Sequence, residues 1–599
     1  MYKSRLGGLV FIFLLLESSF LWASGMGNYR LSLLGELEKK IWRGWVFAKG
    51  EGLPLRWIYP FKAMEKRPLT AVASTLARPE QVIVATGEEI LLSQDGGQTF
   101  RWVADRHAIA HLSYFTAGAI SEENPNEWIV GTSCHGFYIT RDAGKSWRAI
   151  PAAAICLSGQ YYETINDIAY HLSDPDKVYF AYGPHGKIAL LNIKTGFIEP
   201  ILSLPEPDGI VSLSTIKVNS DVWLIGQTQS SIWIFCNNKW LKNRTLYTGF
   251  SPYFSEPRRK KIQDKRGIYL TAWTANNLQS LRNHFVFIKH NGMNAVVIDF
   301  KDDFGSIMYN SQVAMAREAK AIRPIVNIEA LRTLADEFNI HLIARLVVFK
   351  DEKLYRYASN RYALWDKKRD APWAHFIKNS TGKLIQREYW VDIFSTQVWD
   401  YNLQIAEELQ RLGIDEIQFD YIRLPSDGPL GTIAYRHNIY EMKAIDALES
   451  FLKRARAVLS LPISVNVFGY NGWFLTNALG QNIQRLALYV DAISPMTYPS
   501  HYHTKFLGTM PYLKRANLLY KIGSDRAAFY TKEQTCIRQY VQAFLLGPER
   551  KFSKETYSNY IKEQIAGVYS SKGSGFLLWN ASNNYYMVKQ DLAPSHLWY

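Results

Sequence analysis

Hydrophobic and polar positions follow two different rhythms along the chain. From about residue 69 to 240, short alternating stretches are separated by Gly, Asn and Asp, which is typical of antiparallel strands joined by tight turns. Beyond residue 267, strand-like apolar runs alternate with longer segments of helical period. The pattern predicts an all-β domain over 26–254 and an α/β domain over 267–599, joined by a basic linker at 255–266.

The first region repeats itself. Similar units start at Arg78, Asn124, Asp174 and Asp221, so successive starts lie 46, 50 and 47 residues apart. A period of this length with several strands in each unit is typical of propeller blades. Four units, or five if residues 42–59 are counted, predict a small or incomplete β-propeller.

Two of these units carry a related eight-residue segment, SQDGGQTF at 93–100 and TRDAGKSW at 140–147. Both resemble the Asp box of sialidase-type and photosystem-assembly-type propellers. In such a turn Asp95 or Asp142 accepts backbone N–H groups, and the glycine two residues later supplies the unusual dihedral. The resemblance implies a structural role, because Asp boxes lie away from sialidase active sites.

The second region contains eight candidate strands, and helical patterns such as 398–412 and 440–459 lie between most of them. This count and length predict a (β/α)8 barrel. A doubly wound sheet is the alternative, but no GxGxxG or GxxxxGK follows a first strand, so nucleotide binding has no support. The candidate strands are 267–271, 295–300, 341–349, 416–422, 463–467, 492–496, 540–544 and 575–579.

One strand carries the most informative alternation, within LGIDEIQFDYIRLPSDG at 412–428. Glu416, Gln418 and Asp420 occupy one face, and the residues between them, together with Tyr421, are apolar or aromatic. The polar face is expected to look into the barrel. Asp420 then lies at the carboxyl end of a strand, where barrel enzymes carry their chemistry.

Other strand ends supply a second carboxylate and aromatic walls, which is the equipment of glycoside hydrolysis. Asp420, Asp299 and Asp302 are the candidate catalytic residues, one ionised and one held protonated. Arg423 or Lys301 could keep Asp420 ionised. Equally simple structural roles exist: Asp420 could pair with Arg423 and Asp299 with Lys301, and the aromatic residues could be core. The candidate substrate-binding residues are Lys301, Arg423, Asn466, Tyr498, His501 and Trp579.

Five motifs in order give the second region a family resemblance: GIYLTAWTA, AVVIDFKDDFG, IQFDYIRLPSDG, SVNVFGY and SPMTYPSHY. They resemble the glycoside hydrolase domain of secreted bacterial proteins, a barrel family distantly similar to alpha-amylase-type hydrolases. The resemblance implies that Asp420 holds the nucleophile position, with Asp299 at the end of strand two. Amylase-like barrels place their acid at the end of strand five, where this chain has Asn466. An amide cannot act as a general acid, so the acid comes from Asp299 or Asp302, or the site binds sugar without cutting it.

The first 25 residues indicate export. Lys3 and Arg5 precede an apolar run that ends before small residues at 23–25, the pattern of a signal peptide, and no later segment reaches membrane-spanning length. We expect a periplasmic or extracellular protein. The net charge of +15 fits anionic surroundings such as acidic polysaccharide, although no Lys/Arg run is dense enough for a nucleic-acid arm. Four cysteines with no metal-ligand spacing predict no metal site and no cofactor, and leave room for one disulfide.

These observations together predict an exported glycoside hydrolase that acts on an envelope or extracellular polysaccharide. The alternative is a non-catalytic carbohydrate-binding or scaffold protein of the envelope, whose propeller docks a partner protein. Asn466 supports this alternative.

Overall fold

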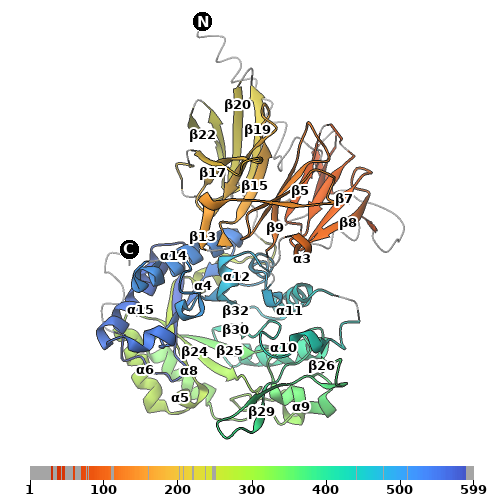
Figure 1. Cartoon of the computed structure of the whole chain (residues 1–599). Helices are drawn as coiled ribbons and strands as arrows, with labels where there is room; N and C mark the ends of the chain where they lie inside the picture. Colours follow the sequence, from red (N-terminus) through yellow and green to blue (C-terminus); the bar gives the residue numbers. More distant parts are fainter. Residues whose placement is uncertain are drawn as a thin grey trace. The chain divides into compact units, whose positions relative to one another are not determined.

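The structure, a computed structural model, describes residues 69–588 with short gaps at 76, 79, 110–112, 159–160, 202, 207, 219–220, 229, 237, 246–250, 440–441, 477 and 509. Nearer the N-terminus it describes only the strands β1 (Tyr29–Leu31), β2 (Leu37–Ile41), β3 (Gly44–Phe47) and β4 (Ile58–Pro60). The expected signal peptide at 1–25 lies outside the described residues. The chain divides into two compact units, Met1–Gly249 and Phe250–Tyr599, and each is described by itself (Figure 1).

The first unit is built from antiparallel sheets that follow one another along the chain (Figure 1). Each sheet pairs consecutive strands, and β4 adds a fifth strand to the first sheet. The sheets are β5–β8 (Ala71–Ser74, Val82–Ala85, Glu89–Ser93, Thr99–Asp105), β9–β12 (Phe115–Ile120, Trp128–Thr132, Phe137–Thr140, Arg148–Ile150), β15–β18 (Ile165–Tyr170, Lys177–Tyr182, Lys187–Asn192, Ile198–Ile201) and β19–β22 (Ile210–Val218, Asp221–Thr228, Ser231–Cys236, Lys239–Thr245). The region is therefore rich in antiparallel sheet.

Two of the turns between these strands are closed by an aspartate. Asp95, between β7 and β8, accepts the backbone N–H groups of Gln98 at 3.0 Å and Thr99 at 2.9 Å. Asp142, between β11 and β12, accepts the N–H of Ser146 at 2.9 Å as well as its hydroxyl, and these hydrogen bonds lower the pKa of Asp142 to about 2. Both aspartates therefore satisfy turn donors.

The second unit contains one parallel sheet of nine strands. Its order along the sheet is β34-β33-β32-β30-β25-β24-β23-β36-β35. Eight strand regions are predicted, and all eight are found. The strands are β23 (Lys265–Leu270), β24 (Ala295–Lys301), β25 (His341–Val347), β30 (Glu416–Asp420), β32 (Ile463–Phe468), β33 (Ala492–Met496), β34 (Cys536–Ile537), β35 (Gln539–Gln542) and β36 (Gly575–Trp579).

The sheet curls round to near closure, as in a (β/α)8 barrel. Its two end strands, β34 and β35, are consecutive in the chain and are separated only by Arg538. The seventh predicted strand, 540–544, overlaps β35, which pairs with β36, whereas the short strand β34 just before it pairs with β33. One strand region therefore bridges both ends of the sheet.

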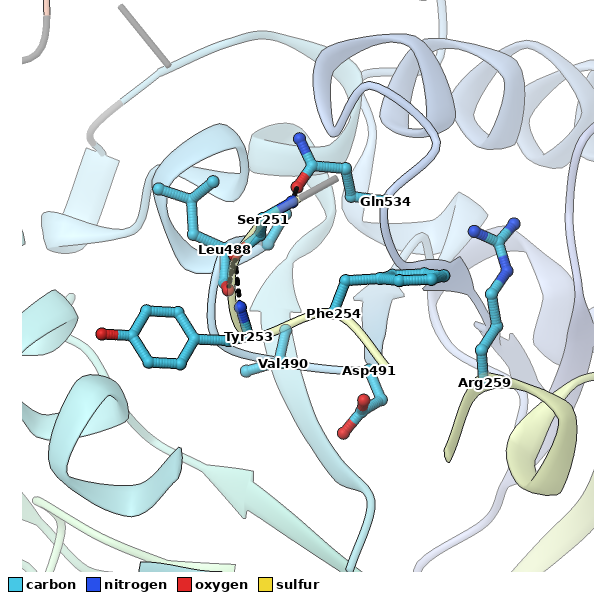
Figure 2. Close-up of a pocket in the computed structure, with 9 residues that line it drawn as sticks. Ser251, Tyr253, Phe254, Arg259, Leu488, Val490, Asp491 and Gln534 are labelled. Atoms are coloured by element: carbon cyan, nitrogen blue, oxygen red, sulfur yellow. Dashed lines mark hydrogen bonds between the residues drawn. The ribbon is translucent and has the colours of Figure 1, made fainter. Parts of the chain in front are cut away.

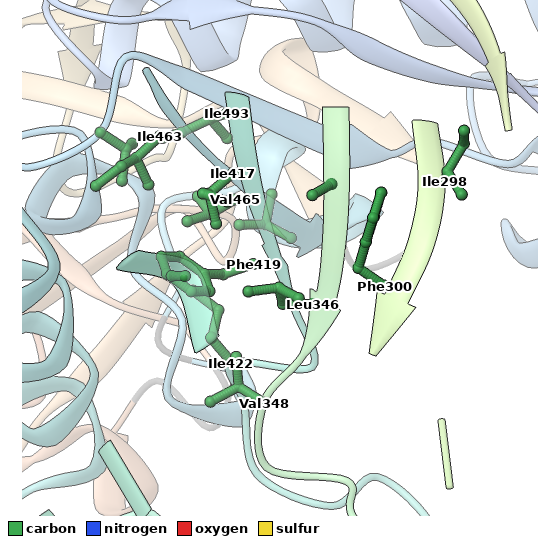
Figure 3. Packing of buried hydrophobic residues seen from close by; sticks show 14 of the residues in the cluster. Ile298, Phe300, Leu346, Val348, Ile417, Phe419, Ile422, Ile463, Val465 and Ile493 are labelled. Carbon is green, nitrogen blue, oxygen red and sulfur yellow. The ribbon is translucent and has the colours of Figure 1, made fainter. Parts of the chain in front are cut away.

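Helices follow most strands and pack on the outside of the barrel. The outward residues of the strands meet them in one large core, and Figure 3 shows Ile417 and Phe419 of β30 beside Val465 of β32 and Leu346 of β25. The main helices are α6 (Leu278–His290), α8 (Ile328–Glu337), α10 (Thr396–Arg411), α11 (Ala444–Val458), α13 (Ile483–Leu486), α14 (Tyr512–Tyr530) and α15 (Lys554–Tyr569).

The alternation expected of strand β30 is present. Glu416 and Gln418 are fully buried among polar groups from other strands: His341 Nε2 lies 3.0 Å from Glu416, and Tyr540 donates its hydroxyl to Gln418 at 2.5 Å. Tyr421 departs from the pattern, because its φ of 51° breaks the strand directly after Asp420. The polar face of β30 thus lines the interior of the barrel.

Residues 255–266 differ from the expected linker. They hold helix α4 (Glu256–Ile262) and the first two residues of β23, and they belong to the second unit. Ser255 caps the helix by accepting the N–H of Arg258, Pro257 occupies the first turn, and basic residues fill the last turn. Each of these features stabilises a helix end, so local capping outweighs the missing apolar periodicity.

The described residues also bear on the expected disulfide and on membrane-spanning segments. None of the four cysteines, all of which lie in the described part, is joined in a disulfide. Within that part of the chain, no helix combines the length and hydropathy that crossing a bilayer requires.

Candidate active site

A cluster of charged side chains lies at the carboxyl ends of three adjacent strands of the barrel. Asp299 belongs to β24, Arg345 to β25, and Asp420 is the last residue of β30. Asp299 and Arg345 are register partners, and Asp420 pairs in register with Val347, two residues after Arg345. The parallel register therefore places Asp299 level with Arg345, and Asp420 one inward position nearer the carboxyl end of its strand.

Arg345 is the centre of the cluster. Its Nη1 donates to Asp299 Oδ1 at 2.7 Å, its Nε to Asp420 Oδ2 at 2.8 Å and its Nη2 to Asp303 Oδ1 at 3.0 Å. Only 3% of the Arg345 surface is exposed, compared with 39% of the Asp303 side chain. One buried cation thus positions three carboxylates, and Asp303 connects them to solvent.

Aromatic rings form a wall beside this cluster. Tyr269 of β23 donates its hydroxyl to Asp299 Oδ2 at 2.5 Å, and its ring stacks on Trp579 of β36 with centroids 3.9 Å apart. The Arg345 guanidinium lies 5.3 Å from the Trp579 ring centroid. Tyr540 of β35 meets Trp579 edge to face at 5.6 Å. The rings of Tyr269 and Trp579 therefore pack directly against the charged cluster.

The two buried aspartates have opposite pKa shifts. Burial raises the pKa of Asp299 to about 6, although Arg345 and the Tyr269 hydroxyl act against it, and the charge of Asp303 adds to the rise. Burial also acts to raise the pKa of Asp420, but Arg345 and hydrogen bonds, including the Tyr421 N–H at 2.7 Å, outweigh it and hold that pKa below its usual range. Neighbouring carboxylates with pKa values pushed apart are the arrangement that acid–base catalysis requires.

Asn466 of β32 lies beside Asp420 and Tyr540. Its side chain is 1% exposed, and neither its Oδ1 nor its Nδ2 has a hydrogen-bond partner at good geometry. Hydrogen bonding from Asn466 nevertheless contributes to the lowered pKa of Asp420 and acts to lower that of Tyr540, so the amide is engaged with both side chains.

Lys301 and Asp302 lie apart from this cluster. Lys301 is fully buried, pairs with Asp351 at 2.7 Å and donates to the carbonyl of Val347. Asp302 Oδ1 accepts the N–H groups of Phe304 and Ser306, which closes the loop after β24. Asp299 and Asp420 take their positive partner from Arg345, and the expected pairings with Lys301 and Arg423 are absent among the described contacts.

The remaining candidates lie around the cluster. Trp579 lines the wall described above, and Tyr498 is 7% exposed within the same interior aromatic group. His501 lies further out, 5.4 Å from the Tyr498 ring. Arg423 stacks on Tyr421, the residue after Asp420, with its guanidinium 4.8 Å from the ring centroid.

Sequence reasoning missed Arg345 and Tyr269 and did not single out Asp303. A signal for Arg345 exists in the strand HLIARLV, where one arginine interrupts an apolar run that is otherwise buried. A cation inside such a strand needs a partner, because an unpaired buried charge is costly. Nothing local in the sequence marks the Tyr269 hydroxyl.

A small hollow lies at the other end of the barrel (Figure 2). It is lined by residues that precede β33 and β34, such as Asp491 and Gln534, and by the segment around Ser251. Strands in this sheet are parallel, so the start of β33 and the end of β30 lie at opposite ends. The hollow is therefore separate from Asp420 and Asp299.

Three solved structures are similar to part of the chain. A hypothetical protein from Ruminiclostridium thermocellum ATCC 27405 is 30% identical, with 33% of this chain and 96% of that chain covered, at a TM-score of 0.29. The glycoside hydrolase domain of PgaB (BpsB) from Bordetella bronchiseptica is 11% identical, covering 53% and 94%, at a TM-score of 0.36. Alpha-L-fucosidase isoenzyme 2 from Paenibacillus thiaminolyticus is 11% identical, covering 53% and 46%, also at 0.36.

The comparison with protein families is the informative one. No curated protein matches the chain. A family described as "Putative glycosyl hydrolase domain" matches residues 267–585, which is more than half of the chain and includes every strand of the barrel from β24 onward. The chain therefore belongs to this glycosyl hydrolase domain family.

Proposed function

We propose that the barrel hydrolyses glycosidic bonds, with Asp420 as the ionised nucleophile or base and Asp299 as the general acid. The observation that carries this proposal is the opposite pKa shift of two buried aspartates on one arginine. Below about pH 6 Asp299 holds a proton, while Asp420 stays ionised. These are the two protonation states that glycoside hydrolysis needs at once.

Asp299 can supply the general acid that Asn466, an amide, cannot be. Its Oδ2 accepts the Tyr269 hydroxyl at 2.5 Å in the ionised form, so protonation of that oxygen requires this hydrogen bond to reverse its direction. Asn466 then supports the ionised form of Asp420, and an amide in this position can also donate to or accept from a sugar hydroxyl. Tyr498, His501 and Trp579 supply further surface for the sugar, whereas Lys301 supports the loops from behind.

The test is a polysaccharide screen that compares the full-length protein with Asp420→Asn. The wild type should release reducing ends from at least one envelope or extracellular polysaccharide. Loss of a group that acts directly on the reacting bond costs roughly 10²–10⁴-fold in turnover. Equal turnover by the two proteins would remove Asp420 from the mechanism.

A non-catalytic, carbohydrate-binding function is the second candidate, and Asn466 favours it. The strand-five position of amylase-like acids holds an amide here, and Arg345 occupies one oxygen of each buried aspartate. This function predicts glycan binding by wild type and Asp420→Asn alike, with no bond cleavage by either.

We propose further that the N-terminal region is a propeller-like module whose turns are Asp boxes. The first strand of each sheet packs on the first strand of the next, β5 on β9, β9 on β15 and β15 on β19, as blades do around an axis. The aspartate-closed turns at Asp95 and Asp142 add support. We also propose, from residues 1–25, that the protein is exported to the periplasm or beyond. There the module would meet proteins of the cell envelope and dock one of them.

Docking can be tested by in-cell photo-crosslinking from exposed positions of the first unit. Phe197 and Leu241 are 68% and 51% exposed. A crosslinker at either position should capture one envelope protein repeatedly. Crosslinks that are no more frequent than those from an exposed barrel position would reject the docking role.

A further inference from the structure

One cation beside the aspartate cluster has no acidic partner in the described part of the chain. Arg423 follows β30 by three residues, and its Nη1 donates to the carbonyl of Leu424 at 2.9 Å and to Ser426 Oγ at 3.4 Å. Among the residues that the structure describes, no carboxylate forms an ion pair with this guanidinium. The side chain is partly exposed, so its remaining donors can reach solvent.

Aromatic rings hold the Arg423 guanidinium in place. Its carbon lies 4.8 Å from the ring centroid of Tyr421, 5.0 Å from that of Trp390 and 5.9 Å from that of Phe468. Tyr421 directly follows Asp420, and Phe468 ends β32, the neighbouring strand, two residues after Asn466. Arg423 is therefore fixed at the rim of the site, between the ends of two strands that carry site residues.

The other cations of this face are already neutralised. Arg345 binds its aspartates, Lys301 pairs with Asp351, and Lys350, which lies 5.1 Å from the Tyr421 ring, is 3.6 Å from Glu388. The positive charge of Arg423 at the rim is thus not balanced by a described carboxylate, unlike the charges of these three side chains. A cation held rigidly without an anion is matched to an anion supplied by a ligand.

The remaining N–H donors of Arg423 also have a defined geometry. Both hydrogen bonds that Arg423 makes to described residues use Nη1, so Nε–H and the N–H groups of Nη2 remain along one edge of a planar group. This edge can donate two parallel hydrogen bonds to the two oxygens of a carboxylate. Among sugars, uronic acids carry a carboxylate.

We propose that the glycan bound at this site contains a uronic acid whose carboxylate is held by the Nε and Nη2 edge of Arg423. This inference rests on the proposed hydrolase site and names its substrate class. The net charge of +15 adds a long-range attraction for a polyanionic chain, which high salt should weaken.

The experiment measures binding by calorimetry with the full-length Asp420→Asn protein, so that no substrate is consumed. The probes are oligosaccharides of mannuronate, guluronate, galacturonate and glucuronate, each with its carboxyl-reduced neutral counterpart. Sulfated galactan oligosaccharides form a second anionic arm. At least one uronate should bind, and its reduced counterpart should bind far more weakly.

Adding Arg423→Gln should weaken uronate binding about 10- to 100-fold, the range for a charge-assisted hydrogen-bonded pair. Arg423→Lys, which keeps the charge but loses the planar edge, should recover only part of the affinity. Arg454→Gln is the matched control, because Arg454 is also a partly exposed arginine over a tryptophan ring, on helix α11. It should leave the binding unchanged.

Several results would overturn the inference: no uronate binds, the reduced counterparts bind equally well, sulfated glycans bind more tightly than uronates, or Arg423→Gln has no effect. These results are separable from failure of the proposed function. If the wild type cleaves neutral glycans, the hydrolase proposal stands and the uronate inference fails. If uronates bind through Arg423 but are never cleaved, the reverse holds.

Discussion

Asp299 should set the alkaline limit of activity. Its folded pKa of about 6 lies above the ordinary value of 3.8, because burial outweighs the attraction of Arg345. As the pH rises through about 6 the proton is lost, and general-acid catalysis falls with it. The acid limit should lie below pH 3.8, since the pKa of Asp420 is lowered from that value.

A pH profile of kcat/KM checks this assignment, because it reports the groups of the free enzyme. Asp299→Asn should lower activity roughly 10²–10⁴-fold and flatten the alkaline limb. An alkaline limb that persists in this variant would assign it to another group. Asp302→Asn should keep the limb near 6, because Asp302 serves its own loop.

Arg345 should matter for stability as well as for activity. Arg345→Met would leave buried carboxylates without their cation, and breaking a buried ion pair on one side costs about 3–5 kcal/mol. Chemical denaturation measures the loss of unfolding free energy. Arg454→Gln, which removes an exposed pair with Asp400 and a contact with the Trp399 ring, should cost about 0–1 kcal/mol. Losses of similar size in the two variants would contradict the role of Arg345.

At the scale of elements, closure of the barrel depends on a glycine. Gly575 starts β36 with a φ of 94°, and a Cβ there would lie 2.2 Å from the carbonyl oxygen of Lys265 in β23. Gly575→Ala should therefore destabilise the second unit by roughly 2–5 kcal/mol, through dihedral strain and a backbone clash. Thermal unfolding followed by circular dichroism gives the change.

Gly431→Ala provides the matched control for this prediction. Nothing lies within 4 Å of a Cβ at Gly431, which is in the loop after β30. The change should leave the unfolding temperature nearly unaltered. A similar drop for both variants would mean that the drop at Gly575 reflects alanine in general and not the approach to β23.

The strands were predictable to a degree that the connecting segments were not. Each barrel strand is a short apolar run with clear ends, so its position follows from the residues alone. Helix α4 was missed because its seven residues carry almost no apolar stripe, and capping together with packing on the barrel base decides its form. The seventh strand, predicted at 540–544, was found as β35, but β34 before Arg538 was not predicted, because its existence depends on pairing with β33.

At the scale of the whole molecule, the two units should fold independently. The large barrel core draws all its residues from the second unit, and the cores of the sheets draw theirs from the first. A fragment of residues 250–599 should therefore unfold cooperatively, at the temperature of the barrel transition in the full-length protein. Calorimetry of both proteins checks this, and a fragment that fails to show a cooperative transition would contradict it.

The sequence by itself determined the β-rich and α/β halves, the eight strand regions of the barrel and the inward face of β30 that ends in Asp420. It also marked Asp299 as a second carboxylate at a strand end. These are local properties, since a period of two fixes which face a residue occupies. Only the tertiary structure decided that Arg345 joins Asp299 to Asp420, that Lys301 turns to Asp351, and that Arg423 forms no ion pair with a described residue. The partner of a charge depends on strand order and register, which bring residues 46 and 75 positions apart into contact, and no local pattern encodes that neighbour.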